Sequence, residues 1–429
     1  MRAPEGEDEP LRRDIGFTGS AFLSFNGVVG AGIFALPATL YTQFGAFSPW
    51  LFPLFGLLVL VIALPFARVA SLFPVSGGPV VYAGTFGPAA SFQAGWLYYV
   101  ARAAALAANT TVLVTYLAAL WPPIGSGVLR AAAIIAITAL LTSINLVGVR
   151  RAVRFLDALT LLKALPLIGT AIFGLVAFGG SIDAPAGVPE LSALEAAALL
   201  ILYAFVGFEN SVVAAGETAD PERTIPRALI TTILCTALLY FIVQLSYVAV
   251  MAPGEGGDAP LVSFGTKLMG PAGGLLLTAA AVFSLMGNVS GGMTASTRAT
   301  YALGRDGLLP AWFGRVSPRW ATPHNSILFM GALIAALALS GSFVWLAVVS
   351  TLARMLVYTI SIAALPKASR QKIGAGTWAL MAAGIAVCVW AALQSAWPSW
   401  RMLLILAAAG TVLYVIARRG AQREPKRPA

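Results

Sequence analysis

The recurrence of long apolar runs constrains this chain more than any other feature. A helix of about 20 apolar residues crosses the ~30 Å hydrocarbon core of a bilayer, and we count roughly twelve such runs between Ile15 and Ala417. Only 10% of the 429 residues are charged, whereas soluble domains carry about 25%. The sequence therefore predicts an all-α integral membrane protein with about twelve transmembrane helices.

The loops between these runs differ in charge. One side of the membrane would hold most of the lysine and arginine residues, and the other keeps only Arg130, Lys267 and Arg401. The positive-inside rule then places both termini in the cytoplasm of a bacterial-type inner (plasma) membrane. Because the basic residues lie in alternate loops, no nucleic acid binding is expected. The spans are expected at residues 15–42, 46–66, 90–120, 129–148, 153–178, 193–216, 226–250, 271–300, 325–341, 343–365, 376–395 and 400–417.

The first span contains a segment that is poorly suited to a continuous helix. Three glycines and a proline fall within Asn26-Gly-Val-Val-Gly-Ala-Gly-Ile-Phe-Ala-Leu-Pro37. Glycine costs about 1 kcal/mol relative to alanine in a helix interior and proline about 3, so we expect a break at Gly30-Ala31-Gly32. Backbone groups at such a break must face a protein cavity rather than lipid. The amides of the outer half-helix suit a carboxylate and the carbonyls of the inner half-helix suit an ammonium group, as in an α-amino acid.

The sixth span contains a second candidate break, in Tyr203-Ala-Phe-Val-Gly-Phe-Glu-Asn-Ser211, where Gly207 and a polar group interrupt an apolar run. Paired interruptions at matching positions of two halves indicate a transporter binding site. The alternative is that the small residues only allow close helix packing, as in many membrane bundles.

The spacing of the two breaks predicts an internal repeat. Residues 15–178 would form a first five-helix repeat and residues 193–365 a second, followed by helices 11 and 12 within 376–417. Residues 1–14 and 418–429 would be cytoplasmic tails. Residue identity between the halves is not obvious, so the repeat depends on spacing alone.

Five motifs follow one another in a specific order. They are Gly30-Ala-Gly-Ile-Phe34, Pro74-Val-Ser-Gly-Gly78, Gly207-Phe-Glu209, Asp220-Pro-Glu-Arg-Thr-Ile-Pro-Arg227 and Tyr301-Ala-Leu-Gly-Arg-Asp-Gly-Leu-Leu-Pro310. Together they resemble the amino acid permease branch of the amino acid–polyamine–organocation (APC) superfamily, which includes the arginine/agmatine antiporter. The resemblance covers nearly the whole chain. It implies a LeuT-like fold, in which two inverted five-helix repeats place broken helices 1 and 6 around the substrate.

The resemblance also implies a substrate site in the two breaks. The substrate carboxylate would bind the amides of the first break, and its ammonium group the carbonyls of Val28, Tyr203 and Val206, with Tyr203 as an aromatic gate. Ala31 departs from the serine that is frequent in the family, so only backbone donors would hold the carboxylate. The implied substrate-binding residues are Val28, Gly30, Ala31, Gly32, Tyr203, Ala204, Phe205 and Val206.

Four charged side chains lie well inside the expected spans, namely Arg102, Lys163, Glu209 and Arg354. Each costs about 2.5 to 3.5 kcal/mol if left at the bilayer centre. At most one of the three cations can pair with Glu209. We interpret Arg102 and Arg354 as mainly structural, through interhelical or lipid-interface contacts.

Lys163 and Glu209 are the candidates for coupling and gating. Lys163 lies about ten residues, or roughly 15 Å, from the cytoplasmic start of its span. A desolvated lysine can lose its proton near physiological pH, so Lys163 either couples transport to protons or only braces carbonyls of the broken first helix. Glu209 matches a glutamate at which the arginine/agmatine antiporter responds to protons. The resemblance thus implies proton sensing or gating for Glu209, and the alternative is a fixed ion pair.

Other classes of function find little support. One histidine and two isolated cysteines offer no nucleophile, metal cluster or haem-ligand pair, so we expect no enzyme, catalytic residue, cofactor or metal site. A channel would favour rings of like charge or a filter motif, whereas broken helices suit an occluded site.

We therefore predict a secondary active transporter of amino acids that works by alternating access and is proton-coupled through Lys163. Aromatic residues near the second break, and no acid beyond Glu209 at that depth, favour a neutral amino acid. Its partners would be this small substrate, protons and membrane lipid. A sodium- and proton-independent exchanger and a polyamine or amine transporter are the open alternatives, and no oligomeric state is predicted.

Overall fold

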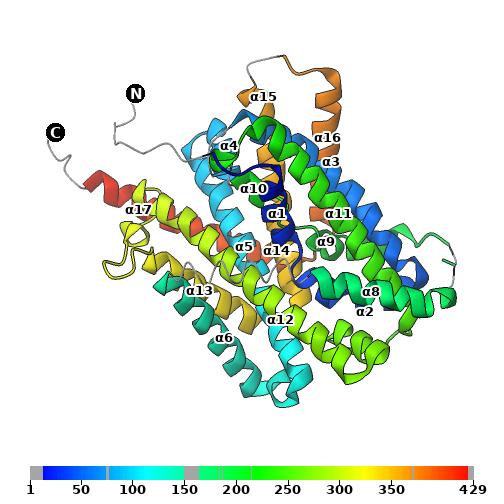
Figure 1. The fold of residues 1–429 in the computed structure, drawn as a ribbon. Coiled ribbons are helices and arrows are strands. Elements are labelled where there is room, and N and C mark those ends of the chain that lie inside the picture. Colours follow the sequence, from blue (N-terminus) through cyan, green and yellow to red (C-terminus); the bar gives the residue numbers. More distant parts are fainter. Residues whose placement is uncertain are drawn as a thin grey trace.

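The computed structural model describes residues 13–73, 77–148, 164–182, 184–185, 187–213, 215–369 and 372–423, which form a bundle of helices (Figure 1). The long helices are α1 (Phe17–Val28), α2 (Ala31–Phe44), α3 (Leu51–Leu72), α5 (Pro88–Leu120), α6 (Gly127–Val147), α8 (Ala164–Phe178), α9 (Leu191–Tyr203), α11 (Pro221–Val250), α12 (Pro260–Arg305), α13 (His324–Ser340), α14 (Phe343–Ala363), α16 (Ala375–Leu393) and α17 (Trp397–Arg423). The short helices are α4 (Pro79–Ala83), α10 (Asn210–Val213), α15 (Leu365–Ala368), η1 (Gly45–Trp50), η2 (Gly84–Phe86), η3 (Pro122–Gly125), η4 (Gly179–Ser181), η5 (Ala215–Glu217) and η6 (Ala311–Gly314).

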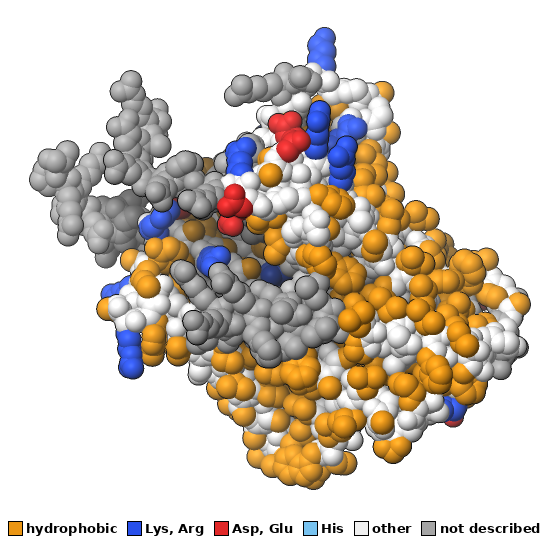
Figure 2. Space-filling model, viewed as in Figure 1, with side chains coloured by type: hydrophobic (Ala, Val, Ile, Leu, Met, Phe, Trp, Pro, Cys, Tyr) orange, Lys and Arg blue, Asp and Glu red, His pale blue; other side chains and the backbone are white. Residues whose placement is uncertain are grey.

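The outside of this bundle is apolar. By length and composition, eight helices in the described part of the chain can cross a membrane, and α8, α9 and α13 are shorter apolar helices. On the face shown in Figure 2, hydrophobic side chains cover most of the lower and right-hand surface, whereas most Lys and Arg side chains lie in the upper part and along the left edge. Apolar side chains that face outward suit lipid rather than water. The structure thus confirms the predicted class, an all-helical multi-pass membrane protein.

The second expected span was placed wrongly along the sequence. The prediction was residues 46–66, whereas α3 starts at Leu51 and continues to Leu72. The residues before it form the 3-10 helix η1, which contains Pro49. Proline lacks a backbone amide and has a fixed φ, so the chain makes a short turn here before the α-helix begins.

Two apolar segments are interrupted. α1 ends at Val28 and α2 begins at Ala31, with non-helical Val29 and Gly30 between them. This interruption is narrower than the predicted Gly30-Ala31-Gly32, because Ala31 and Gly32 already belong to the first turn of α2. The second interruption separates α9 from α10 and occupies residues 204–209.

The two interruptions contact each other through glycine backbones. A Cβ on Gly27 would lie 2.6 Å from the Gly207 carbonyl oxygen, and a Cβ on Gly207 would overlap the Gly27 carbonyl group. Gly207 has a φ of +113°, which side chains rarely allow. Ser24 adds a hydrogen bond from its hydroxyl to the Phe208 carbonyl oxygen, at 2.6 Å. The crossing therefore requires glycine at both positions.

Among the described helices, α5, α12 and α14 bring polar side chains to this crossing. α5 is buried over most of its length and packs against α12 and α14. α5 contributes Arg102 and Asn109, α12 contributes Asn288, and α14 contributes Arg354. Polar side chains from separate parts of the sequence thus meet the interrupted helices.

Replacing Gly207 by alanine tests the crossing. The methyl group would overlap Gly27 and the backbone would be strained, so we expect a loss of stability of about 2 kcal/mol or more. The measurement is the melting temperature of the detergent-purified protein. Gly291→Ala is the matched control, because a Cβ there meets no atom within 4 Å. It lies inside α12, where alanine is favoured over glycine, so it should melt at or slightly above the temperature of the parent. A Gly207→Ala variant as stable as this control would contradict the crossing.

Candidate functional site

A small cavity lies where the two interruptions meet α5, α12 and α14. Its volume is about 30 Å³, and a water molecule needs about 10–15 Å³ of such space. Side chains must therefore move before a larger solute can enter. The cavity is lined by Gly27, Val28, Gly30, Ala31, Gly32, Arg102, Ala105, Leu106, Asn109, Tyr203, Val206, Gly207, Asn288 and Arg354.

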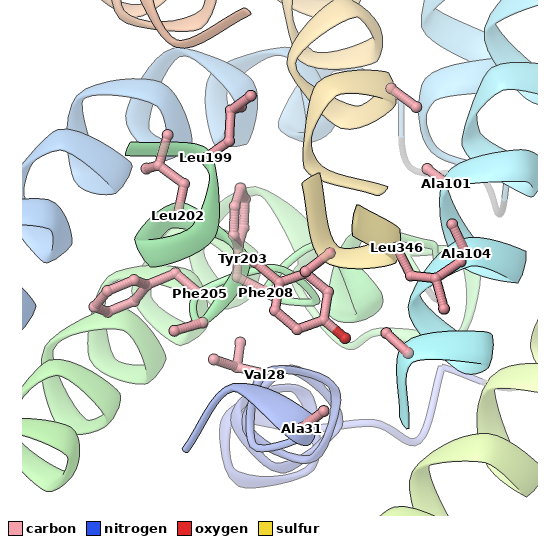
Figure 3. Packing of buried hydrophobic residues seen from close by; sticks show 14 of the residues in the cluster. Val28, Ala31, Ala101, Ala104, Leu199, Leu202, Tyr203, Phe205, Phe208 and Leu346 are labelled. Carbon is pink, nitrogen blue, oxygen red and sulfur yellow. The ribbon is translucent and has the colours of Figure 1, made fainter. Parts of the chain in front are cut away.

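The structure brings most of the predicted substrate-binding residues together at this cavity, but Ala204 and Phe205 are not among its lining residues. Ala204 packs against α2, since a Cβ on Gly32 would lie 2.9 Å from the Ala204 Cα. Phe205 points away from the cavity, and its ring centre lies 6.0 Å from that of Tyr240 (Figure 3). The predicted residues that line the cavity are Val28, Gly30, Ala31, Gly32, Tyr203 and Val206.

Two asparagines bridge the interruption of the first helix. Asn109 Oδ1 accepts a hydrogen bond from the Ala31 amide at 2.9 Å, and Asn109 Nδ2 donates to Asn288 Oδ1 at 2.7 Å. Asn288 Nδ2 donates in turn to the Asn26 carbonyl oxygen at 3.0 Å. This asparagine bridge (Asn109 and Asn288) presents an oxygen to the start of α2 and an N–H group to the end of α1. An α-amino acid would present the same two kinds of group.

Two tyrosine hydroxyls contact polar groups of the cavity lining. Tyr240 donates to the Val28 carbonyl oxygen at 3.1 Å, and the Gly30 amide donates to the same oxygen at 2.8 Å. The carbonyl predicted to receive the ammonium group therefore has two donors in this conformation. The Tyr203 hydroxyl lies 3.5 Å from Asn109 Oδ1, and its ring extends from the second interruption toward α5 (Figure 3).

A buried ion pair joins the second interruption to α14. Glu209 is 0% exposed and Arg354 is 1% exposed, with 3.0 Å between Glu209 Oε1 and Arg354 Nε. Glu209 Oε2 also accepts hydrogen bonds from the Tyr358 hydroxyl at 2.9 Å and the Gly207 amide at 3.0 Å. Arg354 donates further to the Ala101 carbonyl oxygen at 3.1 Å. A buried ion pair is stable only when its hydrogen-bonding groups are satisfied in this way.

Arg102 is the second arginine at the cavity. It is 8% exposed, and one of its terminal nitrogens donates to Asn210 Oδ1 at 2.7 Å. Both Arg102 and Arg354 line the cavity. Their interpretation as mainly structural did not predict this position. Within the described ranges, Arg354 pairs with an acid and Arg102 does not.

Sequence reasoning missed Asn109 and Asn288. Both interrupt apolar spans, and polar side chains in membrane helices usually face the bundle interior, so this signal was available.

Lys163 lies outside the described residues, and its two alternative roles remain predictions. Among the residues that are described, no group of three or more His, Cys, Asp or Glu side chains could hold a metal ion.

A double-mutant cycle tests the buried ion pair. Arg354→Met leaves Glu209 without its cation, so we expect the variant to lose about 3–5 kcal/mol of stability. Adding Glu209→Gln removes the unpaired charge and keeps an acceptor for Tyr358, so the double variant should recover a large part of that loss. Melting temperatures of the purified variants report the result. Additive losses in the double variant would show that the two side chains do not stabilise each other.

Comparisons with known proteins agree with the resemblance carried by the motifs. The amino acid permease family matches residues 15–417. An uncharacterised transporter of Mycobacterium tuberculosis is 29% identical over 350 residues, which cover 78% of this chain and 76% of the relative. The cadaverine/lysine antiporter of Escherichia coli K12 is 30% identical over 323 residues, which cover 73% of this chain and 70% of the antiporter. These relatives are transporters and not enzymes, and the family match covers nearly the whole sequence. The chain therefore belongs to the amino acid permease family.

Proposed function

We propose that this permease is a secondary active transporter of amino acids that binds its substrate at the two interruptions. The observation that supports this most is the convergence of the start of α2, the end of α1 and Tyr203 on one cavity. Amides at a helix start attract a carboxylate, and carbonyls at a helix end attract a cation. One cavity thus offers separate positions for the two ends of an amino acid.

The asparagine bridge suggests how the site exchanges ligand. Asn109 Oδ1 contacts the Ala31 amide and Asn288 Nδ2 contacts the Asn26 carbonyl oxygen. A bound amino acid would replace these contacts with its own carboxylate and ammonium group, so the backbone would stay satisfied with and without substrate. Unsatisfied backbone groups are costly inside a membrane. We propose that this replacement accompanies alternating access in a twelve-helix inverted repeat with cytoplasmic termini in a bacterial inner membrane.

An amine substrate is the second candidate, because one relative is a cadaverine/lysine antiporter. Cadaverine has two positive charges and no carboxylate. The cavity is lined by two arginines, of which only Arg354 is paired with an acid among the described residues. Like charges repel strongly when they are poorly solvated. The charges therefore support one part of the predicted neutral substrate, namely that its side chain is not cationic.

Uptake into proteoliposomes distinguishes the two candidates. We expect the reconstituted protein to take up at least one labelled amino acid, with competition from unlabelled amino acids. The amine that lacks the α-carboxylate of the same substrate should compete at least tenfold less well, because it cannot bind the amides of α2. Uptake of amines alone would contradict the amino acid proposal, as would uptake equal to that of empty liposomes.

Proton coupling is proposed through Lys163. In Lys163→Gln, a proton gradient should no longer drive accumulation, whereas exchange of internal for external substrate should continue. Accumulation and exchange are measured in the same proteoliposomes with labelled substrate. Lys267→Gln is the matched control, because Lys267 lies on the surface and pairs with Glu255. Proton-driven accumulation that survives in Lys163→Gln would exclude the coupling role and leave bracing of the first helix.

A further inference from the structure

The charges around the cavity point to a narrower substrate class. We propose that the central site takes amino acids with an acidic side chain and that Arg102 binds the side-chain carboxylate. This inference rests on the proposed transport of amino acids.

Arg102 has hydrogen-bonding capacity that the described protein groups do not use. A guanidinium carries five N–H donors, and Arg102 makes one hydrogen bond, to Asn210 Oδ1. The side chain is 8% exposed and lines the cavity. Its remaining donors are therefore available to a solute in the cavity. Arginine binds carboxylates through two parallel hydrogen bonds, which makes it selective for that group.

The cavity carries a surplus of positive charge. Arg354 and Glu209 neutralise each other at 3.0 Å, and Arg102 has no ion pair with any acid among the residues that the structure describes. A buried charge without a counter-ion is unfavourable, especially within a membrane. A neutral amino acid would leave this surplus unchanged and a cationic one would increase it. An acidic amino acid carries one net negative charge and would compensate it.

The geometry gives the two carboxylates of such a substrate different receptors. Asn109 marks the start of α2, since its Oδ1 accepts from the Ala31 amide. Arg102 lies on the same helix, α5, seven residues before Asn109, which is about 10 Å of helix rise. Both side chains line the same cavity, so the two positions face one solute. The α-carboxylate would bind at Ala31 and the side-chain carboxylate at Arg102, with the ammonium group near the end of α1.

This arrangement discriminates between substrates of nearly equal size. Glutamate and glutamine differ only in the charged group that Arg102 would bind. A carboxylate gains a charge-assisted pair there, whereas an amide leaves the guanidinium without a counter-ion. Lysine would bring a second cation beside Arg102. The expected order of affinity is glutamate or aspartate first, then glutamine or asparagine, with lysine last.

Ligand-induced thermal stabilisation of the purified protein tests this order, because a ligand that binds only the folded state raises its melting temperature. The ligands are glutamate, aspartate, glutamine, asparagine, lysine and glutarate, a dicarboxylate without an amine. We expect half-maximal stabilisation by an acidic amino acid at a concentration at least tenfold lower than by its amide. Stabilisation by neutral or cationic amino acids at equal or lower concentration would overturn the acidic class and leave amino acid transport standing. Stabilisation by glutarate as strong as that by glutamate would also overturn the acidic amino acid class, since the ammonium group would then contribute nothing to binding.

Arg102→Gln tests the residue itself. In competition for uptake, the preference for glutamate over glutamine should fall at least tenfold in this variant, because glutamate would bind more weakly. Arg130→Gln is the matched control, because Arg130 contacts Thr115 and Gly125 and does not line the cavity. If Arg102→Gln does not fold, Arg102→Lys keeps the charge and should retain a reduced preference for the acid. An undiminished preference in either folded variant would contradict the role of Arg102, whereas a parent protein that takes up no amino acid would contradict the proposed function instead.

Discussion

The contact between the backbones of Gly27 and Gly207 is the constraint on which the rest of the site depends. It lets two apolar segments from different parts of the sequence cross at the points where each loses its helical geometry. Backbone amides and carbonyls at the interruptions then face a protein cavity instead of lipid, which is the condition for broken helices in a membrane. Side chains at either glycine would separate the two segments and open the cavity walls.

Polar side chains from neighbouring helices satisfy the groups that the crossing exposes. The asparagine bridge connects the two sides of the first interruption. Glu209 accepts from the Gly207 amide and pairs with Arg354 on α14, so it holds the second interruption against the bundle. Under the proposed function, the same groups would define what the cavity binds. The asparagine bridge would mark the positions for the two ends of an amino acid, and the arginines would select the charge of its side chain.

The sequence alone predicted the helical membrane class and the approximate positions of both interruptions, because glycine and proline act locally through backbone conformation. It was not sufficient for the partners of these segments. Arg354 meets Glu209 across 145 positions, and Asn109 and Asn288 meet across 179. A polar residue in an apolar span indicates that it faces the bundle interior, but it does not indicate which distant residue it meets there. The interpretation of Arg102 and Arg354 as structural agrees with their interhelical contacts, but it gave neither arginine a position at the cavity.

A cryo-electron microscopy structure of the protein in lipid nanodiscs with saturating substrate would show directly whether substrate binds at the interruptions. We expect a first helix interrupted at Val29 and Gly30, with the substrate carboxylate within about 3 Å of amides at the start of α2. We also expect Asn109 to have left the Ala31 amide. A continuous first helix, or a substrate bound away from both interruptions, would contradict the proposed binding site.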